Sequence, residues 1–341
     1  MNITIPDRNL FKWIGGKKWL KNNIQNKIKQ REFKEASIYI EPFCGGLGAF
    51  KSILPILEEN QFQKIILNDI NTLVIETFKA TKSKHKELIK AYENITTEFF
   101  NCFNKEAIEC SKFIKDGNKL IETKGKYFYY DLDKTRDKII LKSLFLQEAN
   151  DFFNKTRKEF NIEKFEKNIS VECIAKFLFL MENCFNGTYR ENSKGEFNTP
   201  FNWGNAPKNC FNKIEIIKEY NLFFNEIDIT FENLDVFSLF LKYKSINAFL
   251  YLDPPYLNLS ENSANKYNKD AFCFDKQLKL LNYTLSYKYV LYSNHDLPIL
   301  KDFLKKNLFD IDIVFRKNIM SSKNDSRKND VAEILAFKYD I

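Results

Sequence analysis

Short hydrophobic runs that end in polar residues recur along the chain. Four of them cover residues 37–43, 64–69, 246–252 and 287–296, and stretches of helical character separate them. Continuous apolar runs of this length are typical of parallel strands that crossover helices bury on both faces. The pattern therefore predicts an α/β fold.

Two further hydrophobic runs stand near the C-terminus, at residues 309–318 and 331–339, with the polar loop 320–330 between them. They indicate two more strands. The middle of the chain is different, because residues 169–183 carry hydrophobic positions at helical spacing. We therefore predict an α/β domain formed by residues 1–94 and 231–341, and a mostly helical insertion formed by residues 95–230.

The composition is that of a globular protein with an excess of positive charge. The 341 residues are 44% hydrophobic and 29% charged, with a formal net charge of +8. This charge fits a polyanionic partner, or equally the lysine-rich surface of a protein from an AT-biased genome. The sequence has no run of about 18 uncharged apolar residues, so it predicts no membrane span. The first residues lack the features of a signal peptide. We expect a cytoplasmic protein.

The cysteines and histidines show no metal-binding pattern. Seven cysteines and two histidines are present, and no cysteine pair has CxxC spacing. The sequence therefore predicts neither a zinc site nor a disulfide framework.

A glycine-rich segment follows the first predicted strand. Gly45, Gly46 and Gly48 stand just before a predicted helix, where glycine allows positive φ angles and close approach of the backbone to a ligand. Ligands of open α/β sheets bind at the carboxyl ends of the strands. The spacing is not GxGxxG, so a dinucleotide is not indicated, and a tight strand-to-helix turn is the alternative.

Asp69 ends the second predicted strand. An acid at this position commonly accepts the hydroxyl groups of a ribose, so Asp69 suggests a nucleoside-bearing cofactor. A cap on the following helix is the competing interpretation.

Four segments resemble, in their order, the motifs of one enzyme family. "FKWIGGK", "EPFCGGLGAF", "NDIN" and "DPPY" are similar to the N-terminal, cofactor-binding and catalytic motifs of DNA adenine-N6 methyltransferases, specifically the Dam-like group (D12 class, alpha-group). Residues 185–201, "FNGTYRENSKGEFNTPF", resemble the segment with which that group reads DNA. The resemblance spans residues 11–340 except about 95–165. It implies a Rossmann-like SAM-dependent methyltransferase sheet with an inserted target-recognition domain.

The resemblance implies S-adenosylmethionine (SAM) as the cofactor. The matching residues are Trp13, Lys17, Glu41, Phe43, Gly45, Gly48, Asp69, Asp235 and Asp253. For Asp235, which would meet the adenine ring of SAM, a helix N-cap is the alternative interpretation.

The catalytic motif that the resemblance implies is Asp253, Pro254, Pro255 and Tyr256. An adenine N6 amine is a poor nucleophile, and hydrogen-bond acceptors favour its attack. Asp253 and the Pro254 carbonyl would be these acceptors, because proline has no N–H to donate. Tyr256 would stack on an adenine that is flipped out of the duplex. His295 is expected to shape the site without acting as a base.

The resemblance also implies contacts to double-stranded DNA. The matching residues are Lys12, Phe185, Asn186, Thr188, Arg190, Pro200, Lys323 and Arg327. Phe185 would fill the gap left by the flipped base, or else pack in the core of the insertion. Lys323 and Arg327 would contact phosphates, unless their loop is only a solvated hairpin.

Lys12 and Arg190 suit guanine and favour the recognition sequence GATC. Thr188 and Glu191 depart from the family pattern, which has leucine and tyrosine there, and Glu191 would place an acid near DNA. A monomer is sufficient for chemistry on one base, and a cognate restriction endonuclease is a possible partner. The alternatives are a SAM-dependent enzyme acting on RNA or a protein amide, and a DNA-binding protein without catalysis.

Overall fold

The computed structural model describes residues 4–13, 15–29, 33, 36–115, 121–123, 126–129, 147–202, 210–244, 247–256, 272–316 and 331–339. The chain divides into two compact units. We call residues 15–75 with 227–341 the sheet unit, and residues 1–14 with 76–226 the helical unit. The boundaries expected between the catalytic domain and the insertion, at 94/95 and 230/231, stay predictions.

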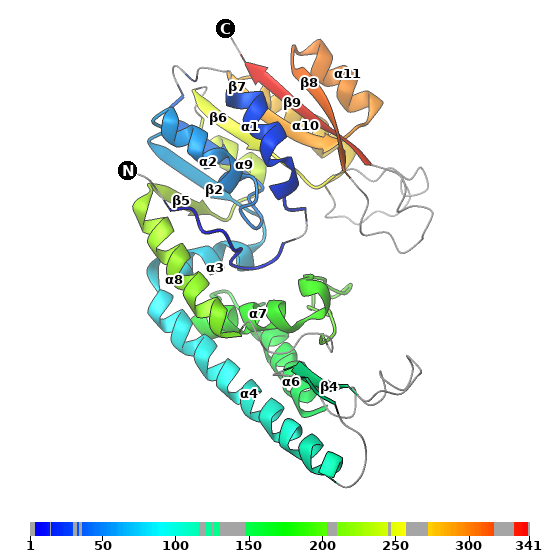
Figure 1. Ribbon diagram of the computed structural model, residues 1–341. Helices are drawn as coiled ribbons and strands as arrows, with labels where there is room; N and C mark the ends of the chain where they lie inside the picture. The colour runs from blue at the N-terminus through cyan, green and yellow to red at the C-terminus, as the bar shows by residue number, and fades with distance from the viewer. Residues whose placement is uncertain are drawn as a thin grey trace. The chain divides into compact units, whose positions relative to one another are not determined.

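The sheet unit is built on a seven-stranded sheet with the order β5-β2-β1-β6-β7-β9-β8 (Figure 1). Strand β9 is antiparallel to both of its neighbours, and the other pairs are parallel. The strands are β1 (Ile38–Glu41), β2 (Lys64–Asn68), β5 (Ile229–Glu232), β6 (Ala248–Leu252), β7 (Tyr289–His295), β8 (Asp310–Arg316) and β9 (Val331–Tyr339). This arrangement is the predicted Rossmann-like α/β fold, and each predicted strand is present.

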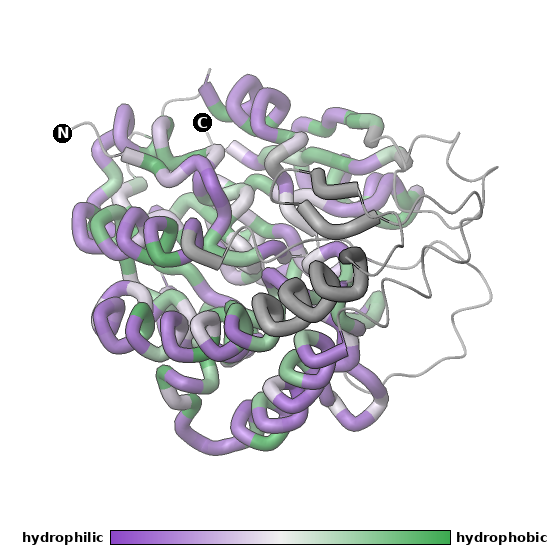
Figure 2. Tube along the Cα trace, turned by 60° about the horizontal axis from the view of Figure 1, so that its bottom comes forward, coloured by the Kyte–Doolittle hydropathy of each residue, from purple (hydrophilic) through white to green (hydrophobic). Residues whose placement is uncertain are grey.

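Two of the described helices of the sheet unit precede the first strand, and the others lie in the connections between strands. The helices are η1 (Lys18–Leu20), α1 (Lys21–Lys29), α2 (Phe50–Glu59), α9 (Val236–Lys242), α10 (Phe274–Thr284) and α11 (Pro298–Lys306), and α3 (Thr72–Ser83) begins in this unit. Hydrophobic and hydrophilic residues alternate in bands along the helices (Figure 2), as expected for helices that bury one face.

Strand β6 lies at the centre of the sheet and is buried along its whole length. Leu250 packs in a core with residues of α9, α10 and α11. Phe249, on the opposite face, contacts the rings of Phe33 and Tyr39. Burial on both faces explains the continuous hydrophobic run in the sequence, since neither side of the strand meets water.

The helical unit holds the rest of the described elements. They are α4 (His85–Lys115), β3 (Ile121–Thr123), β4 (Lys126–Tyr129), α6 (Gln147–Glu163), α7 (Val171–Asn183), η2 (Phe185–Gly187) and α8 (Cys210–Glu226). Helix α7, predicted from its periodicity, is capped by the Ser170 side chain, which accepts from the Cys173 N–H.

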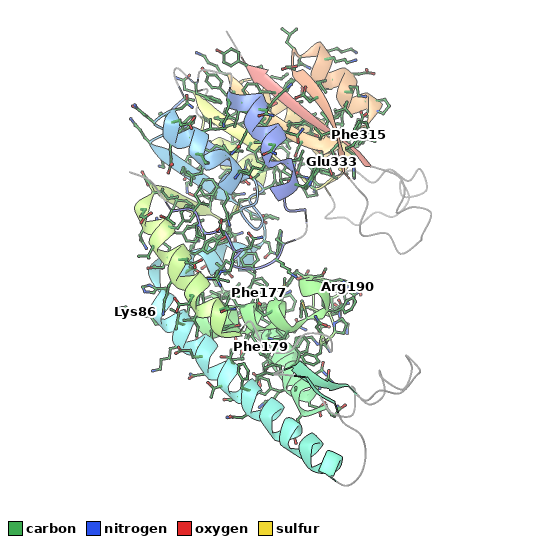
Figure 3. All side chains as sticks on the ribbon, in the orientation of Figure 1. Lys86, Phe177, Phe179, Arg190, Phe315 and Glu333 are labelled. Carbon is green, nitrogen blue, oxygen red and sulfur yellow. The ribbon has the colours of Figure 1, made fainter. Side chains whose placement is uncertain are left out.

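Aromatic rings fill the core of the helical unit. Phe99 of α4 meets Phe179 of α7 with ring centroids 5.0 Å apart, and Phe153 of α6 meets Phe201 at 5.4 Å. Figure 3 labels Phe177 and Phe179, which α7 contributes. Offset and edge-on aromatic pairs of this kind add to the free energy of burial.

The central position of β6 generates a testable prediction about stability. Leu250→Ala removes a fully buried side chain, so we expect the sheet unit to lose about 2–5 kcal/mol of unfolding free energy. The matched control is Leu241→Ala, because Leu241 is 58% exposed on α9 and should change little. Urea denaturation followed by circular dichroism measures both variants. Equal midpoints for the two would contradict the assignment of β6 to the core.

Candidate active site

The strand order reverses between β1 and β6, because the chain proceeds from β1 to β2 on one side and from β6 to β7 on the other. Ligands of open α/β sheets bind at such a switch point, outside the carboxyl ends of the strands. The glycine-rich loop follows β1 and the Asp253–Tyr256 motif follows β6. The topology therefore brings both motifs to the same edge of the sheet.

The glycine-rich loop is a tight turn whose backbone packs closely. Gly45 has a φ of +44°, which favours glycine. A Cβ atom on Gly48 would lie 3.0 Å from the backbone nitrogen of Lys17, so the absence of a side chain lets the two loops touch. Phe43 packs edge-on against Phe272, with ring centroids 5.6 Å apart. The turn interpretation is thus correct, and a ligand-binding role is compatible with it.

Asp69 holds this loop and does not cap the following helix. Its Oδ2 accepts from the Gly45 N–H at 3.0 Å, and its Oδ1 accepts from the Asn71 N–H at 2.9 Å. The cap of α3 is Asn71, whose Oδ1 accepts from the N–H groups of Leu73 and Val74. Burial raises the pKa of Asp69, and the two backbone hydrogen bonds counteract this rise.

Asn68 is a residue that the sequence did not single out. Its buried side chain donates to the carbonyls of Pro42 (2.9 Å) and Leu234 (3.0 Å), and its Oδ1 accepts from the Leu234 N–H at 2.9 Å. It thereby joins the loops that follow β1, β2 and β5. A polar residue just before Asp69 at the end of a buried strand was the available signal.

Glu41 is buried at the end of β1, where it accepts a hydrogen bond of 2.6 Å from the Tyr39 hydroxyl. Burial raises its pKa well above the usual range, and this hydrogen bond lowers it in part. Asp235 is different, because it is exposed and caps α9 by accepting from the N–H groups of Phe237 and Ser238. The Ser238 hydroxyl lowers the pKa of Asp235 further. The capping interpretation is therefore observed, and contact with SAM stays a prediction.

The ammonium of Lys17 contacts both ends of the Asp253–Tyr256 motif. Its Nζ lies 3.1 Å from Asp253 Oδ1 and 3.5 Å from Glu333 Oε2, and its side chain is 4% exposed. It also donates to the Tyr256 hydroxyl and lies 4.1 Å from the centroid of that ring. The Tyr256 hydroxyl donates in turn to Glu333 Oε2 at 2.9 Å. Figure 3 labels Glu333 on β9.

Ser293 and His295 of β7 complete the surroundings of the motif. The Ser293 hydroxyl donates to Asp253 Oδ1 at 2.9 Å, and the His295 ring lies edge-on to Tyr256, with centroids 4.6 Å apart. Burial raises the pKa of Asp253; the Lys17 charge and the Ser293 hydrogen bond lower it, and Glu333 raises it. The sequence did not indicate Glu333 or Ser293, because their partners are far away along the chain.

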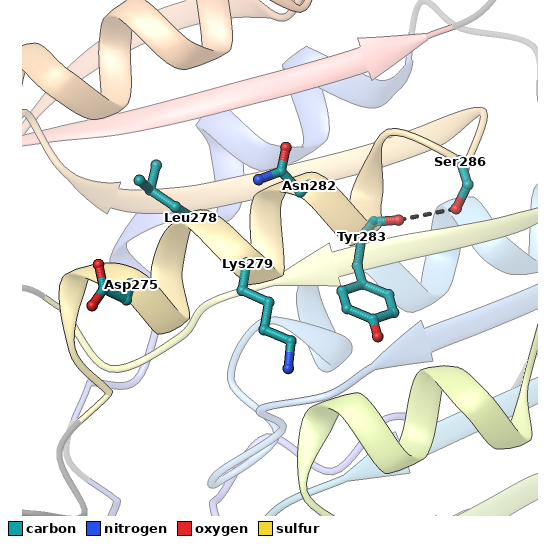
Figure 4. A pocket seen from close by; sticks show the side chains of 6 residues that line it. All are labelled: Asp275, Leu278, Lys279, Asn282, Tyr283 and Ser286. Atoms are coloured by element: carbon teal, nitrogen blue, oxygen red, sulfur yellow. Dashed lines mark hydrogen bonds between the residues drawn. The ribbon is translucent and has the colours of Figure 1, made fainter.

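Gln277 of α10 supports the motif from its other side. Its buried side chain donates to the Pro255 carbonyl at 2.7 Å, and its Oε1 accepts from the Tyr292 hydroxyl at 3.1 Å. The outer face of α10 carries a separate surface pocket of about 630 Å³ (Figure 4). It is lined by Asp275, Leu278, Lys279, Asn282, Tyr283 and Ser286, so none of the catalytic motif lies in it.

Most of the predicted DNA-binding residues lie in the helical unit, on or beside a hairpin formed by residues 188–199. Its arms pair through the Glu191–Phe197 bridge, and Phe185 donates its N–H to the Pro200 carbonyl at 2.9 Å. Phe185 is 55% exposed, so it is not part of the core. Lys323 and Arg327 lie outside the described residues.

The N-terminal segment reaches the same hairpin within the helical unit. A Cβ atom on Gly187 would lie 2.7 Å from Cδ of Lys12, so the lysine stem packs on that glycine. The Trp13 ring stacks on Tyr189, with centroids 5.4 Å apart. Lys12 therefore lies beside Asn186 and Thr188 of the predicted DNA-reading segment, while contact of Trp13 with SAM stays a prediction.

Comparison with known proteins identifies the family. The model of the D12 class N6 adenine-specific DNA methyltransferases matches residues 13–321. The chain belongs to this family. Residues 76–226 of the helical unit lie between the glycine-rich loop and the Asp253–Tyr256 motif in the sequence of this family member.

Three relatives of this D12-class chain are similar to it over almost their whole length. Type II methyltransferase M.MjaIII of Methanocaldococcus jannaschii is 29% identical over 96% of this chain and 98% of its own. Type II methyltransferase M1.LlaDCHI of Lactococcus lactis subsp. cremoris is 26% identical, covering 97% and 95%. DNA adenine methylase of Escherichia coli K12 is 24% identical, also covering 97% and 95%.

Within the described residues of this family member, neither a membrane-spanning helix nor a three-residue metal site is present. None of their helices is long and apolar enough to span a bilayer. Within the same residues, no group of three His, Cys, Asp or Glu side chains could hold a metal ion.

The role of Asn68 can be tested in this D12-class chain. Asn68→Ala leaves the Leu234 N–H and two buried carbonyls without their partner, and each unsatisfied group costs about 1–3 kcal/mol. We expect faster amide hydrogen exchange in the loops around residues 42–49 and 233–235, measured by mass spectrometry. Asn282→Ala, at an exposed position of α10, is the control and should leave these loops unchanged. Unchanged exchange in Asn68→Ala would show that this amide does not hold the loops.

Proposed function

We propose that the protein transfers the methyl group of SAM to the N6 amine of an adenine in double-stranded DNA. The observation that carries this proposal is the cluster at the carboxyl end of β6, in which Lys17 and Ser293 contact Asp253, and Tyr256 contacts both Lys17 and Ser293. The family to which the chain belongs supports the reaction class.

The residues at the switch point fit SAM as the methyl donor. When bound, SAM supplies an electrophilic methyl group on a sulfonium. It also carries an ammonium and ribose hydroxyls, and the carboxylates of Glu41, Asp69 and Asp253 suit these groups. We infer that the holding residues are Trp13, Lys17, Glu41, Phe43, Gly45, Gly48, Asp69, Asp235 and Asp253.

Asp253 and Pro254 would hold the two hydrogens of the adenine amine. Among the described residues, both partners of the Asp253 carboxylate contact Oδ1, so Oδ2 is available as an acceptor. Pro254 has no N–H, and the Pro255 carbonyl is fixed by Gln277. Fixed acceptors act by positioning, which can contribute about 7–11 kcal/mol in favourable cases.

Tyr256 would stack on the target adenine after it is flipped out of the duplex. Its hydroxyl is held by Lys17 and Glu333, so the ring is oriented before DNA binds. The Lys17 ammonium lies over the ring, and we expect the base at the opposite face. Stacking of about 1–3 kcal/mol would partly offset the cost of unstacking the base.

We further propose that DNA is read by the 188–199 hairpin together with the N-terminal segment, and that GATC is the site. Lys12 and Arg190 are exposed and suit the O6 and N7 atoms of guanine. Phe185, also exposed, would occupy the gap left by the flipped base. Contacts from Asn186, Thr188 and Pro200 would complete the interface, and Lys323 and Arg327 would contact phosphates.

The wider setting of the reaction follows from the same proposal. Two relatives are called type II methyltransferases, which makes a cognate restriction endonuclease an expected partner. Because one base is modified at a time, a monomer suffices. We also expect the protein to act in the cytoplasm.

The reaction and its site can be tested together. We expect labelled SAM and unmethylated duplex DNA to yield N6-methyladenine, detected after digestion to nucleosides, and only within GATC in sequenced DNA. Asp253→Ala should abolish transfer, because it removes the acceptor for the adenine amine. Label in any other nucleoside would refute the reaction, and a different modified sequence would refute the assignment of Lys12 and Arg190.

Removing the charge of Lys17 and removing that of Glu333 should shift the pH dependence of activity in opposite directions. Asp253 must be ionised to accept from the amine, and burial raises its pKa, so activity should fall as the pH decreases through this raised value. Lys17 lowers the pKa of Asp253 and Glu333 raises it. Lys17→Met should therefore move the acid limb of the single-turnover rate to higher pH, and Glu333→Gln should move it to lower pH.

The matched control for these two variants is Lys21→Met, because Lys21 is exposed at the start of α1. Its profile should coincide with that of the wild type. Shifts of Lys17→Met and Glu333→Gln in the same direction would be incompatible with Asp253 as the titrating group.

A further inference from the structure

One face of α6 follows the second arm of the 188–199 hairpin. Arg157, Asn161 and Lys164 have the spacing i, i+4 and i+7, which places them on one side of a helix. Lys164 directly follows the last residue of α6, and its N–H still donates to the Phe160 carbonyl. The three side chains therefore form a stripe, which we call the α6 rail.

The α6 rail binds the hairpin backbone at every second residue. Arg157 Nη1 donates to the Thr199 carbonyl at 3.2 Å, and Lys164 Nζ donates to the Gly195 carbonyl at 2.7 Å. Between them, Asn161 donates to the Phe197 carbonyl at 3.0 Å and accepts from the Phe197 N–H at 2.8 Å.

The two repeats are similar in length. The step from Arg157 to Asn161 rises about 6 Å and that from Asn161 to Lys164 about 4.5 Å, while two residues of an extended strand rise about 6.6 Å, and the long lysine side chain covers the remaining distance. Successive side chains of the rail can therefore reach alternate peptide groups of the arm. Because all of these bonds go to the backbone, they hold the arm against the helix whatever its side chains are, and the register depends on the residue-specific contacts of Lys164 with Glu191 and Tyr189.

Lys164 also binds the first arm. Its Nζ contacts the Glu191 carboxylate and lies 2.8 Å from the Tyr189 hydroxyl, which itself donates to Glu191 at 2.6 Å. The Lys164 side chain is only 9% exposed. The acid of Glu191 is thus neutralised by a lysine and directed toward α6, so it is not an unpaired negative charge on a DNA-facing surface.

Arg190 stands between Tyr189 and Glu191, and successive side chains of an extended arm point to opposite sides. Since its two neighbours are bound to Lys164, Arg190 belongs to the opposite side of the arm, and it is exposed; Figure 3 labels it. Asn198 of the other arm accepts from Arg190 Nε at 2.9 Å. A slip of one residue would reverse this order and present Glu191 in place of Arg190.

We propose that the α6 rail sets the register of the 188–199 hairpin and thereby controls the DNA sequence selectivity of the enzyme without touching DNA. Arg157, Asn161 and Lys164 are positioning residues in this account. The inference rests on the proposed function and deepens it, and it gives a role to part of the 95–165 region, for which the resemblance provides no counterpart.

The test compares selectivity with catalysis in the full chain. The measured quantity is the ratio of kcat/KM on a duplex with the preferred site to that on duplexes with one base pair changed. We expect Lys164→Met and Asn161→Asp to lower this ratio about 10-fold or more, within the range for loss of a bidentate base contact. The value of kcat on the preferred site and the affinity for SAM should stay within about two-fold of wild type. Asn161→Asp keeps the acceptor for the Phe197 N–H, loses the donor to the Phe197 carbonyl and adds a negative charge beside that carbonyl.

Lys158→Met is the matched control, because Lys158 is exposed on the same helix and outside the rail, and it should keep the wild-type ratio. Glu191→Gln keeps the shape of the hairpin and weakens its bond to Lys164, so it should lower the ratio if Lys164→Met does not fold. Faster amide exchange of residues 188–199 in the rail variants should accompany the loss of selectivity.

The outcomes separate the two proposals. A selective wild type with equally selective rail variants would overturn the rail and leave the proposed function intact. An equal fall of kcat, SAM affinity and selectivity would mean that the rail only supports folding, and would overturn its role in selectivity. A wild type that methylates no duplex adenine would overturn the proposed function and the selectivity role with it.

Discussion

The sheet unit's site depends on one buried positive charge. Lys17 compensates Asp253 and Glu333 and also binds the Tyr256 hydroxyl. Two carboxylates this close in a largely buried site would be costly without this ammonium, because a charge that has lost water and has no partner is unfavourable. The ion cluster joins a loop before α1, the end of β6 and strand β9, which are far apart in the sequence. The Asp253–Tyr256 motif is therefore held by a charge that the motif itself does not contain.

In the helical unit, two lysines with little exposure are paired with carboxylates in a similar way. Lys164 binds Glu191, a tyrosine hydroxyl and a backbone carbonyl. Lys213 of α8, with a side chain 2% exposed, binds Glu182 and donates to the Leu10 carbonyl at 2.6 Å. Leu10 stands just before Lys12, so this lysine anchors the segment that packs on Gly187. An ammonium has three donors, which suits it to join a carboxylate and a backbone carbonyl in one place.

These lysines also qualify what the net charge says about function. A charge of +8 suggests a polyanionic partner, yet some of the lysines are buried and already paired. What a DNA duplex would meet is the charge that stays exposed, such as that of Lys12 and Arg190. Composition alone cannot distinguish the two kinds of lysine, because burial depends on the tertiary fold.

The strands were predictable because their signal is local. A run such as residues 248–252 is apolar throughout since helices and rings cover both of its faces. Strand β5 was not predicted, because it lies at the edge of the sheet and alternates between buried and half-buried positions. The motif residues Asp69 and Asp253 were also found from sequence, by their place at strand ends. Which group caps α3 was not decidable, because Asp69 and Asn71 are both good caps.

The partners of the site residues were not predictable, since they come from distant parts of the chain. Nothing near Asp253 indicates Glu333, and nothing near Glu191 indicates Lys164. The case of Glu191 shows why this matters for function. The presence of Glu191 in the sequence is evidence against a DNA-reading surface there, because an acid repels phosphate. In the structure it is paired with Lys164, which follows α6, and with Tyr189 of the hairpin. The departure from the family pattern thus concerns how the hairpin is held, and the exposed Arg190 beside it keeps the charge that suits guanine.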